Sequence, residues 1–276
     1  MQQSNTSNLV LGGGSAYNGT ANGKIQKHAP VGNLWIPFAP SDAGSAIGAC
    51  LYHWHNTLGN AKVNGGDNQS PYLGPEWTNQ QLTDIILKEK ITNKAMFYDD
   101  TKMLCQKVAK LINDGAVVGW FQGRTEFGAR ALGNRSILAN PHLPDVRDRI
   151  NRVVKKRELF RPFAPSVVVE EYAKYFTSEG EVPYMNQVVK VTNYKSIPSV
   201  THIDGSARIH TVTKKQNKLY HTLLKEFKKV SGTPILLNTS FNLRGHTMTN
   251  DPQKAIWTFL NSDMDYLVLG NYLISK

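Results

Sequence analysis

Apolar residues recur at helical spacing in several parts of the chain. Three stretches place them on one face of a predicted helix: Leu82, Ile85 and Ile86; Leu104, Val108, Leu111 and Ile112; and Leu219, Leu223, Leu224 and Phe227. Thr78 precedes the first stretch as an N-cap, and Gly115 would end the second. The lysines of the third stretch mostly lie off its apolar face, so we predict that they are solvated.

Continuous apolar runs predict buried strands between these helices. They are "AVVGWFQG" (116–123), "FAPSVVVEEY" (163–172), "YMNQVVKV" (184–191), "SARIHTVT" (206–213) and "TPILLNTSFN" (233–242). The first run directly follows the helix at 104–112 and ends in glycine. Because this order of elements is typical of α/β domains, we predict a mixed α/β (α+β) fold.

A loop-rich polar stretch with proline, glycine and asparagine interrupts the pattern from residue 64 to about Phe97. Such a composition is typical of a connector, and the helix predicted after Thr78 begins inside it. With 276 residues the chain is long enough to bury two cores. We place the boundary near residue 95, which gives domains at 1–95 and 96–276.

The front of the chain carries a glycine turn. A short apolar run at 9–11 stops at Gly12, Gly13 and Gly14, and Asn18 lies near a predicted helix start. Backbone N–H groups at a glycine turn and at a helix N-terminus can bind a phosphate without hindrance from side chains. An ordinary turn between a strand and a helix explains the same residues equally well.

Asp42 begins an Ala/Gly-rich segment in which Ile47 and Leu51 share one helical face. Its carboxylate could cap that helix or bind a metal ion, and the pattern alone leaves both interpretations open. His53 and His55 lie two positions apart, so on a helix their side chains diverge and they form a weak ligand pair.

Composition limits the binding partners and the cellular compartment that we expect for the protein. The formal net charge of +11 fits nucleic acid, an anionic membrane surface or small polyanionic substrates. Cys50 and Cys105 form no CxxC or metal-type spacing, which favours a reducing compartment, and we predict the cytoplasm. The first residues show no basic segment leading into an apolar run, and no stretch reaches the roughly 18 apolar residues of a membrane helix.

Basic residues concentrate in two consecutive segments. "GRTEFGARALGNRSILANP" (123–141) contains Arg124, Arg130 and Arg135, and "DVRDRINRVVKKRELFRPFAP" (145–165) has seven Lys or Arg against three Asp or Glu. We find no helix-turn-helix, zinc-finger or RNA-motif signature beside them. Arginines that alternate with glycine, proline and apolar residues indicate a partly buried cleft, where guanidinium groups need anionic partners. Glu126 and Glu158 would pair with some of them, and phosphate suits the rest.

A third motif, "PILLNTSFNLRG" (234–245), ends an apolar strand in small polar residues. Asn238, Thr239, Ser240 and Asn242 would turn hydroxyls and amides toward a cleft, or would bond their own backbone in a turn. The neighbouring basic cluster favours the cleft.

These motifs resemble a known family. "GRTEFGARALGNRSILANP", "KKRELFRPFAPSV", "HIDGSARIHTV" and "PILLNTSFNLRG", in this order, are similar to the NodU/CmcH-type carbamoyltransferases over nearly the whole chain. The resemblance implies part of an actin-like ATPase-fold (ASKHA) subdomain followed by a YrdC-like domain. It also implies that carbamoyl phosphate and ATP, with Mg²⁺, give carbamoyl-adenylate, phosphate and pyrophosphate. The carbamoyl group then passes to an acceptor hydroxyl near a bound iron(II).

The same resemblance assigns roles to single residues. Those implied to hold carbamoyl phosphate and the ATP phosphates during reaction are Arg130, Lys155, Arg157, Arg161, Arg208 and Ser240. Those implied to bind substrate or nucleotide are Gly12, Gly13, Gly14, Asn18, Arg124, Arg135, Asn238, Thr239 and Asn242. Asp42 matches an iron ligand, and His210 stands where relatives often carry glutamine.

The resemblance also shows a departure, because relatives carry a further N-terminal half with an HxxxH pair that completes the iron site. We therefore expect a split enzyme, in which a second polypeptide supplies that half. The acceptor would be a sugar or polyketide hydroxyl, or a hydroxymethylated base in DNA. Two alternatives stay open: a threonylcarbamoyl-adenylate-type synthase, and a non-catalytic subunit that binds nucleotide or nucleic acid.

Overall fold

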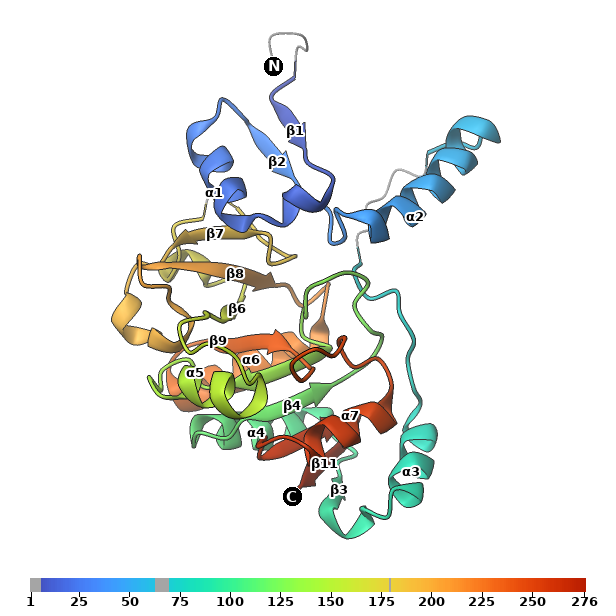
Figure 1. Ribbon diagram of the computed structural model, residues 1–276, viewed down its shortest axis with the longest axis vertical. Coiled ribbons are helices and arrows are strands. Elements are labelled where there is room, and N and C mark those ends of the chain that lie inside the picture. Colours follow the sequence, from blue (N-terminus) through green and yellow to red (C-terminus); the bar gives the residue numbers. More distant parts are fainter. Residues whose placement is uncertain (1–5, 63–69, 179) are drawn as a thin grey trace.

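The computed structural model describes residues 6–62, 70–178 and 180–276. Its centre is a sheet in the order β3-β11-β10-β4-β5-β9-β6-β8-β7 (Figure 1). These strands span β3 (Ala95–Phe97), β4 (Val118–Phe121), β5 (Arg135–Ala139), β6 (Ala164–Val168), β7 (Gln187–Lys190), β8 (Ser206–Val212), β9 (Ile235–Ser240), β10 (Tyr266–Leu269) and β11 (Tyr272–Ser275). Parallel and antiparallel pairs both occur, so the sheet is mixed.

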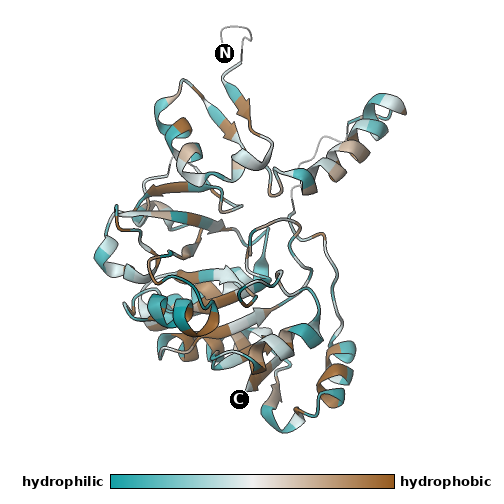
Figure 2. Cartoon of the chain, viewed as in Figure 1, coloured by the Kyte–Doolittle hydropathy of each residue, from teal (hydrophilic) through white to brown (hydrophobic). Residues whose placement is uncertain are grey.

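Helices cover both faces of this sheet. On one face α4 (Thr101–Asn113) packs against α6 (Lys218–Ser231). On the other lie α3 (Asn79–Lys88), α5 (Val146–Arg149), the π-helical turn η5 (Ile150–Val154) and α7 (Pro252–Leu260). Short 3₁₀ turns occur at Thr92–Lys94, Tyr172–Lys174, Tyr194–Ser196 and Pro198–Val200. Figure 2 shows the hydrophobic segments gathered on the central strands and on the helices that cover them.

The strand alternation builds two cores. Leu236 of β9 faces the α4 and α6 side, while the next residue, Leu237, faces the α3 and α7 side. Side chains of successive residues point to opposite faces of a strand, so a doubly covered sheet needs continuous apolar runs. This need explains why the five predicted runs became β4, β6, β7, β8 and β9.

The predicted helix boundaries at Thr78 and Gly115 are confirmed. Thr78 caps α3 in a capping box, because its Oγ1 accepts from the Gln81 N–H at 3.3 Å and Gln81 Oε1 accepts from the Thr78 N–H at 2.9 Å. Gly115 follows α4 with φ of 98°, a conformation that glycine adopts without strain. The connector predicted from residue 64 to about Phe97 lies partly outside the described residues, and the domain boundary near residue 95 stays a prediction.

The front of the chain forms a smaller layer. The parallel strands β1 (Asn8–Val10) and β2 (Asn33–Trp35) flank the 3₁₀ turn η1 (Gly14–Tyr17) and α1 (Gly19–His28). As predicted, Asn18 lies at the start of α1: it is the N-cap residue, and its side chain accepts from the Ala21 N–H. The helix lies against β7, the edge strand of the large sheet, and a Cβ at Gly23 would overlap the Val188 carbonyl oxygen. Only glycine permits this close approach.

Beyond this layer, α2 (Asp42–Tyr52) and the π-helical turn η2 (His53–Thr57) project from the body (Figure 1). None of their residues is buried. Cys50 on α2 is exposed and Cys105 on α4 is buried, and both are free thiols. Among the described helices, none has the length and apolar character needed to cross a membrane.

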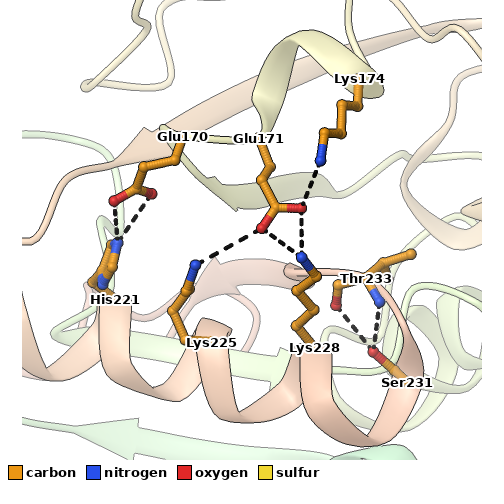
Figure 3. Close-up of polar contacts among 8 residues, drawn as sticks. All are labelled: Glu170, Glu171, Lys174, His221, Lys225, Lys228, Ser231 and Thr233. Carbon is orange, nitrogen blue, oxygen red and sulfur yellow. Dashed lines mark hydrogen bonds and ion pairs between the residues drawn. The ribbon is translucent and has the colours of Figure 1, made fainter.

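Glutamates after β6 fasten α6 to the sheet (Figure 3). Lys228 Nζ lies 2.8 Å from Glu171 Oε1, and Lys225 Nζ lies 3.8 Å from the same atom. Glu170 Oε1 lies 2.9 Å from His221 Nε2. The side chains of Lys225 and Lys228 are still 44% and 39% exposed, so the prediction that these lysines are solvated is confirmed, and each also pairs with Glu171.

Candidate active site

A cavity of about 440 Å³ opens between the start of α1, the start of β8 and the end of β9. Four arginines line it: Arg130, Arg157, Arg161 and Arg208. Its opposite wall consists of residues 17–20, and Asn238, Thr239 and Ser240 lie along its floor. Among the described residues that line it, none is acidic. The structure thus brings together eight of the predicted residues: Asn18, Arg130, Arg157, Arg161, Arg208, Asn238, Thr239 and Ser240.

Arg208 is the most deeply placed of these cations. It lies on β8, and its Nε is buried without a hydrogen-bond partner among the described residues. Burial, followed by the charges of Arg130 and Arg157, lowers the pKa of Arg208 to about 10. A buried guanidinium beside two like charges is unfavourable until an anion joins it.

Arg130 connects the two walls of the cavity. Its Nη2 donates to the Tyr17 carbonyl oxygen at 3.4 Å, and its guanidinium lies 5.3 Å from the centre of the Tyr17 ring. Burial lowers the pKa of Arg130 as well. The loop 128–133 that carries it is rich in glycine and alanine, which lets this arginine approach the front layer.

Arg157 and Arg161 are held by a buried amide. Asn151 Oδ1 accepts from Arg157 Nε at 2.7 Å, and Asn151 Nδ2 donates to the Arg161 carbonyl oxygen at 2.9 Å. Arg161 also pairs with Glu158 at 3.8 Å, as the sequence predicts. Both side chains of that pair are more than half exposed, so it contributes little and leaves Arg161 available to an anion.

Lys155 lies beside a second cavity of about 200 Å³, which shares Arg157, Arg161 and Ser240 with the first. Its Nζ donates to the Ser240 carbonyl at 2.6 Å, to Asn242 Oδ1 at 2.7 Å and to the Asn242 carbonyl at 3.0 Å. Together with Ser240 Oγ at 3.3 Å, these acceptors are enough to occupy all three hydrogens of an ammonium group. Burial and the charge of Arg157 lower the pKa of Lys155 to about 7. Lys155 therefore fixes the turn after β9, and Asn242 lies in this second cavity rather than the first.

A buried polar chain supports the floor. Asn238 Nδ2 donates to the Ala131 carbonyl oxygen at 3.1 Å and to Ser166 Oγ at 3.0 Å, and Ser166 Oγ lies 2.9 Å from His210 Nδ1. Burial lowers the pKa of His210 to about 3, so the ring is neutral. Because Ser166 accepts from Asn238, its own hydrogen goes to Nδ1 of the ring. His210 thus lies behind the wall and does not line the cavity.

Arg135 lies outside both cavities, contrary to its predicted role. It is fully buried, and its Nη1 donates to the Gln122 and Asn134 carbonyl oxygens at 2.5 and 3.1 Å. Its guanidinium lies 3.6 Å from the centre of the Phe121 ring. The aromatic ring, the carbonyl oxygens and the charges of Glu126 and Glu76 stabilise the guanidinium group that the sequence assigned to a phosphate.

Glu126 does not form the predicted ion pair with an arginine. Its Oε1 accepts from the backbone N–H groups of Leu132, Asn134 and Arg135 at 2.7, 2.9 and 3.2 Å. Burial, opposed by these hydrogen bonds, raises the pKa of Glu126. The carboxyl group shapes the turn that carries Arg130, and so acts on the site from a distance.

The remaining predicted binding residues are also outside the cavity lining. Arg124 donates to the Gly74 and Leu73 carbonyl oxygens at 3.0 and 2.9 Å and is exposed. Gly12, Gly13 and Gly14 form the expected turn, in which the Gly13 N–H donates to the Pro40 carbonyl oxygen at 2.5 Å. Of the front segment, only residues from Tyr17 onward reach the cavity.

Asp42 is the first residue of α2 and is exposed. The interpretation of Asp42 as a cap is wrong, because Ser41 holds the N-cap position. Within the described residues no group of three His, Cys, Asp or Glu side chains could hold a metal ion. These residues alone do not fit an iron site, so an iron at Asp42 would need ligands from elsewhere.

Sequence reasoning missed several residues of this site, four of which carry a polar group. Tyr17, Thr20 and His202 line the first cavity, and Asn151 orients Arg157. Tyr17 and Thr20 surround the Asn18 cap, which is a local signal that could have revealed them. His202 stands inside the quoted "HIDGSARIHTV" motif, whereas nothing local marks Asn151.

Comparison with known proteins gives these motifs a context. Residues 109–276 match the family model described as carbamoyltransferase C-terminus, and residues 1–51 match carbamoyltransferase N-terminus. Nodulation protein NolO of Bradyrhizobium diazoefficiens is 41% identical over 97% of this chain and 49% of its own length. The 3'-hydroxymethylcephem-O-carbamoyltransferase of Amycolatopsis lactamdurans is 33% identical over 95% of this chain and 48% of its own length. The chain therefore spans about half the length of these relatives.

A crystal structure of full-length HypF in the phosphate- and nucleotide-bound form is 18% identical. It covers 63% of this chain and 22% of that one, with a TM-score of 0.43. This likeness is too low to support an argument about the site.

Proposed function

Because this chain belongs to the carbamoyltransferase family, we propose that its arginine-lined cavity forms carbamoyl-adenylate from carbamoyl phosphate and ATP. The observation that carries the proposal is a cavity with four arginines and, among its described lining residues, no carboxylate. Both substrates are phosphate esters or anhydrides, and guanidinium groups bind phosphate oxygens in bidentate fashion.

The proposed reaction joins a carbamate oxygen to the α-phosphorus of ATP and breaks the bond to the β-phosphate oxygen, so pyrophosphate leaves. Balancing the atoms requires one water, which takes the phosphoryl group of carbamoyl phosphate as inorganic phosphate. Negative charge grows on the leaving oxygens, where fixed arginines stabilise it. Arg208 and Arg130 would stabilise that charge inside the first cavity. Arg157 and Arg161 would stabilise it where the first cavity joins the second.

Magnesium and iron would have different places in this scheme. With no carboxylate among the described lining residues, Mg²⁺ would be held mainly by the phosphates of ATP. For iron(II), Asp42 would offer one carboxylate oxygen, and histidines from outside the described residues would complete the site.

We further propose that the acceptor is a hydroxyl group and that a second polypeptide helps to bind it. The Amycolatopsis relative is named for a hydroxymethyl acceptor, which supports the chemical class. Leu51, Tyr52, Trp54 and Leu58 on and after α2 are 49%, 67%, 52% and 55% exposed. An apolar helix with no buried residue indicates a docking face, and the half of the relatives that this chain does not span is its proposed occupant.

Pyrophosphate release from ATP tests the proposed function. The purified chain should release pyrophosphate only when carbamoyl phosphate is present, and Arg130→Ala and Arg208→Gln should each lower the rate at least about 100-fold. Arg152→Gln is the matched control, because Arg152 is exposed and lies outside both cavities. Pyrophosphate release at the same rate with and without carbamoyl phosphate would refute the proposal. Release at the wild-type rate in both variants would refute it as well. Salt-sensitive binding of nucleic acid without release would instead favour the binding subunit.

A further inference from the structure

Two turns of the chain are joined by hydrogen bonds in both directions beside the second cavity, and we call this pair of turns the clasp. The first, residues 155–157, follows η5, and the second, residues 240–245, follows β9. Lys155 of the first turn donates to the Ser240 and Asn242 carbonyl oxygens of the second. In return, Arg244 Nη1 of the second turn donates to the Lys156 carbonyl oxygen at 2.8 Å. Each turn thus contributes a cation that binds the backbone of the other.

Lys156, at the centre of this clasp, adopts a left-handed backbone conformation with φ of 46°. Steric repulsion at Cβ disfavours this region for every residue except glycine. Such a conformation persists only where surrounding contacts hold it, and it is often found at functional sites. Lys155 and Arg157, on either side of Lys156, both line the second cavity.

We propose that Arg244 is a positioning residue of the anion site: its hydrogen bond to the Lys156 carbonyl holds the left-handed turn that directs Lys155 and Arg157. An effect of Arg244 on catalysis rests on the function proposed above, whereas its effect on the conformation of the Lys156 turn does not. Arg244 itself is exposed and lies on the rim of the same cavity.

Lys155 can report the state of this turn. The charged groups that share its cavity are Arg157, Glu158, Arg161 and Arg244, and its hydrogen-bond partners Ser240 and Asn242 are neutral. Burial is the main reason why the pKa of Lys155 falls to about 7. A turn that opens admits water and returns the pKa of this amine toward its ordinary value.

The test measures the rate at which acetic anhydride modifies Lys155 in the full chain as a function of pH, followed by mass spectrometry. Arg244→Met is expected to raise the pH midpoint by about one unit, because it removes the hydrogen bond that holds the turn closed. Arg244→Lys, which keeps a donor, should restore most of the wild-type midpoint. Should Arg244→Met fail to fold, Arg244→Gln takes its place. Arg152→Gln should leave the midpoint unchanged.

A double-mutant cycle separates positioning from direct charge effects. Glycine tolerates the left-handed region, so in a Lys156→Gly background the loss of Arg244 should shift the midpoint by less than half as much. An equal shift in both backgrounds, or no shift in either, overturns the proposal. A wild-type chain that releases no pyrophosphate would refute the proposed function but would leave these midpoints as a valid test of Arg244.

Discussion

The guanidinium of Arg130 lies over the ring of Tyr17 at 5.3 Å, and the two residues are 113 positions apart in the chain. One belongs to the front layer and the other to the glycine-rich loop before β5. The arginine-lined cavity exists only where these two parts of the chain meet, so its shape depends on how firmly they are joined.

Removing the Tyr17 ring should weaken ATP binding. Tyr17→Ala takes away both a cavity wall and the surface on which Arg130 stacks, and we expect about a 3- to 30-fold rise in the Kd of ATP. Tyr17→Phe keeps the ring and should stay within about twofold of the wild type. Isothermal titration calorimetry measures both, and equal losses in the two variants would show that the hydroxyl, not the stacking, matters.

Replacing Arg208 should stabilise the empty protein while it abolishes anion binding. The wild-type guanidinium is buried against the like charges of Arg130 and Arg157. Arg208→Gln relieves that repulsion, so the Tm without ligand should rise by about 2–4 °C. Pyrophosphate should raise the Tm of the wild type and not that of the variant. Scanning calorimetry measures these Tm values, with Arg152→Gln as the control. A lower Tm in Arg208→Gln than in the wild type would contradict a destabilising repulsion among the three arginines.

Anion binding should weaken as the pH rises above neutrality. The folded chain lowers the pKa of Lys155 from 10.5 to about 7, so the unfolded chain binds this proton more tightly. This difference in pKa lowers the free energy of unfolding by its full amount below pH 7, and the loss disappears as the pH rises from 7 to about 10.5. An anion favours the charged amine, so its binding above pH 7 takes up a proton and its affinity falls by up to about tenfold per pH unit.

Calorimetry of ATP binding in buffers of different ionisation enthalpy measures that proton uptake. Lys155→Arg keeps a charged group throughout this range and therefore reports the pH dependence that belongs to ATP alone. The same proton uptake in this variant and in the wild type would exclude Lys155 as the titrating group.

A methyl group at Gly23 should separate α1 from β7. Its Cβ would overlap the Val188 carbonyl oxygen, so the helix must move and carry residues 17–20 of the cavity wall with it. We expect Gly23→Ala to lower the Tm and to lower pyrophosphate release at least about tenfold. Gly48→Ala, on α2 where nothing lies within 4 Å, is the matched control and should retain wild-type activity. Normal release by Gly23→Ala would show that the wall tolerates displacement.

On the proposal above, the apolar face of α2 should be required for docking of a polypeptide that corresponds to the half of the relatives that this chain does not span. Co-expression with the corresponding half of the Bradyrhizobium relative, followed by size-exclusion chromatography, should give a complex that Trp54→Glu disrupts. Ile203→Glu changes a 97% exposed apolar residue elsewhere on the surface and should leave the complex intact. A complex that survives Trp54→Glu would place the interface on another surface.

Local patterns in the sequence were sufficient for much of this fold. Long apolar runs and clear caps identified β4, β6, β7, β8, β9, α3, α4 and α6. β5 was not predicted, because its apolar run from Ser136 to Ala139 is short. Its place in the sheet depends on pairing with β4 and β9, which are separate segments of the sequence. α7 could have been found, since Asp251 before Pro252 is an N-cap signal and its side chain accepts from the Lys254 N–H.

The arginines of the candidate site were predictable from the motifs in which they stand. Arg130, Arg157, Arg161 and Arg208 meet as expected, although the sequence separates them by up to 78 positions (208 minus 130). Arg135 was predicted wrongly because its environment combines Phe121, Trp77 and several carbonyls, a set that only the tertiary structure assembles. Charge and spacing alone do not tell a guanidinium that binds phosphate from one that packs on aromatic rings.

The packing of α1 on β7 also bears on solubility. An uncovered edge strand offers free backbone groups to any other strand that approaches, and unprotected edges lead to aggregation between molecules. With Gly19 and Gly23 against Val188, the helix occupies the approach to that edge. A chain trimmed of its first 30 residues would therefore expose β7, and such a fragment would be expected to self-associate through this strand before any loss of its core.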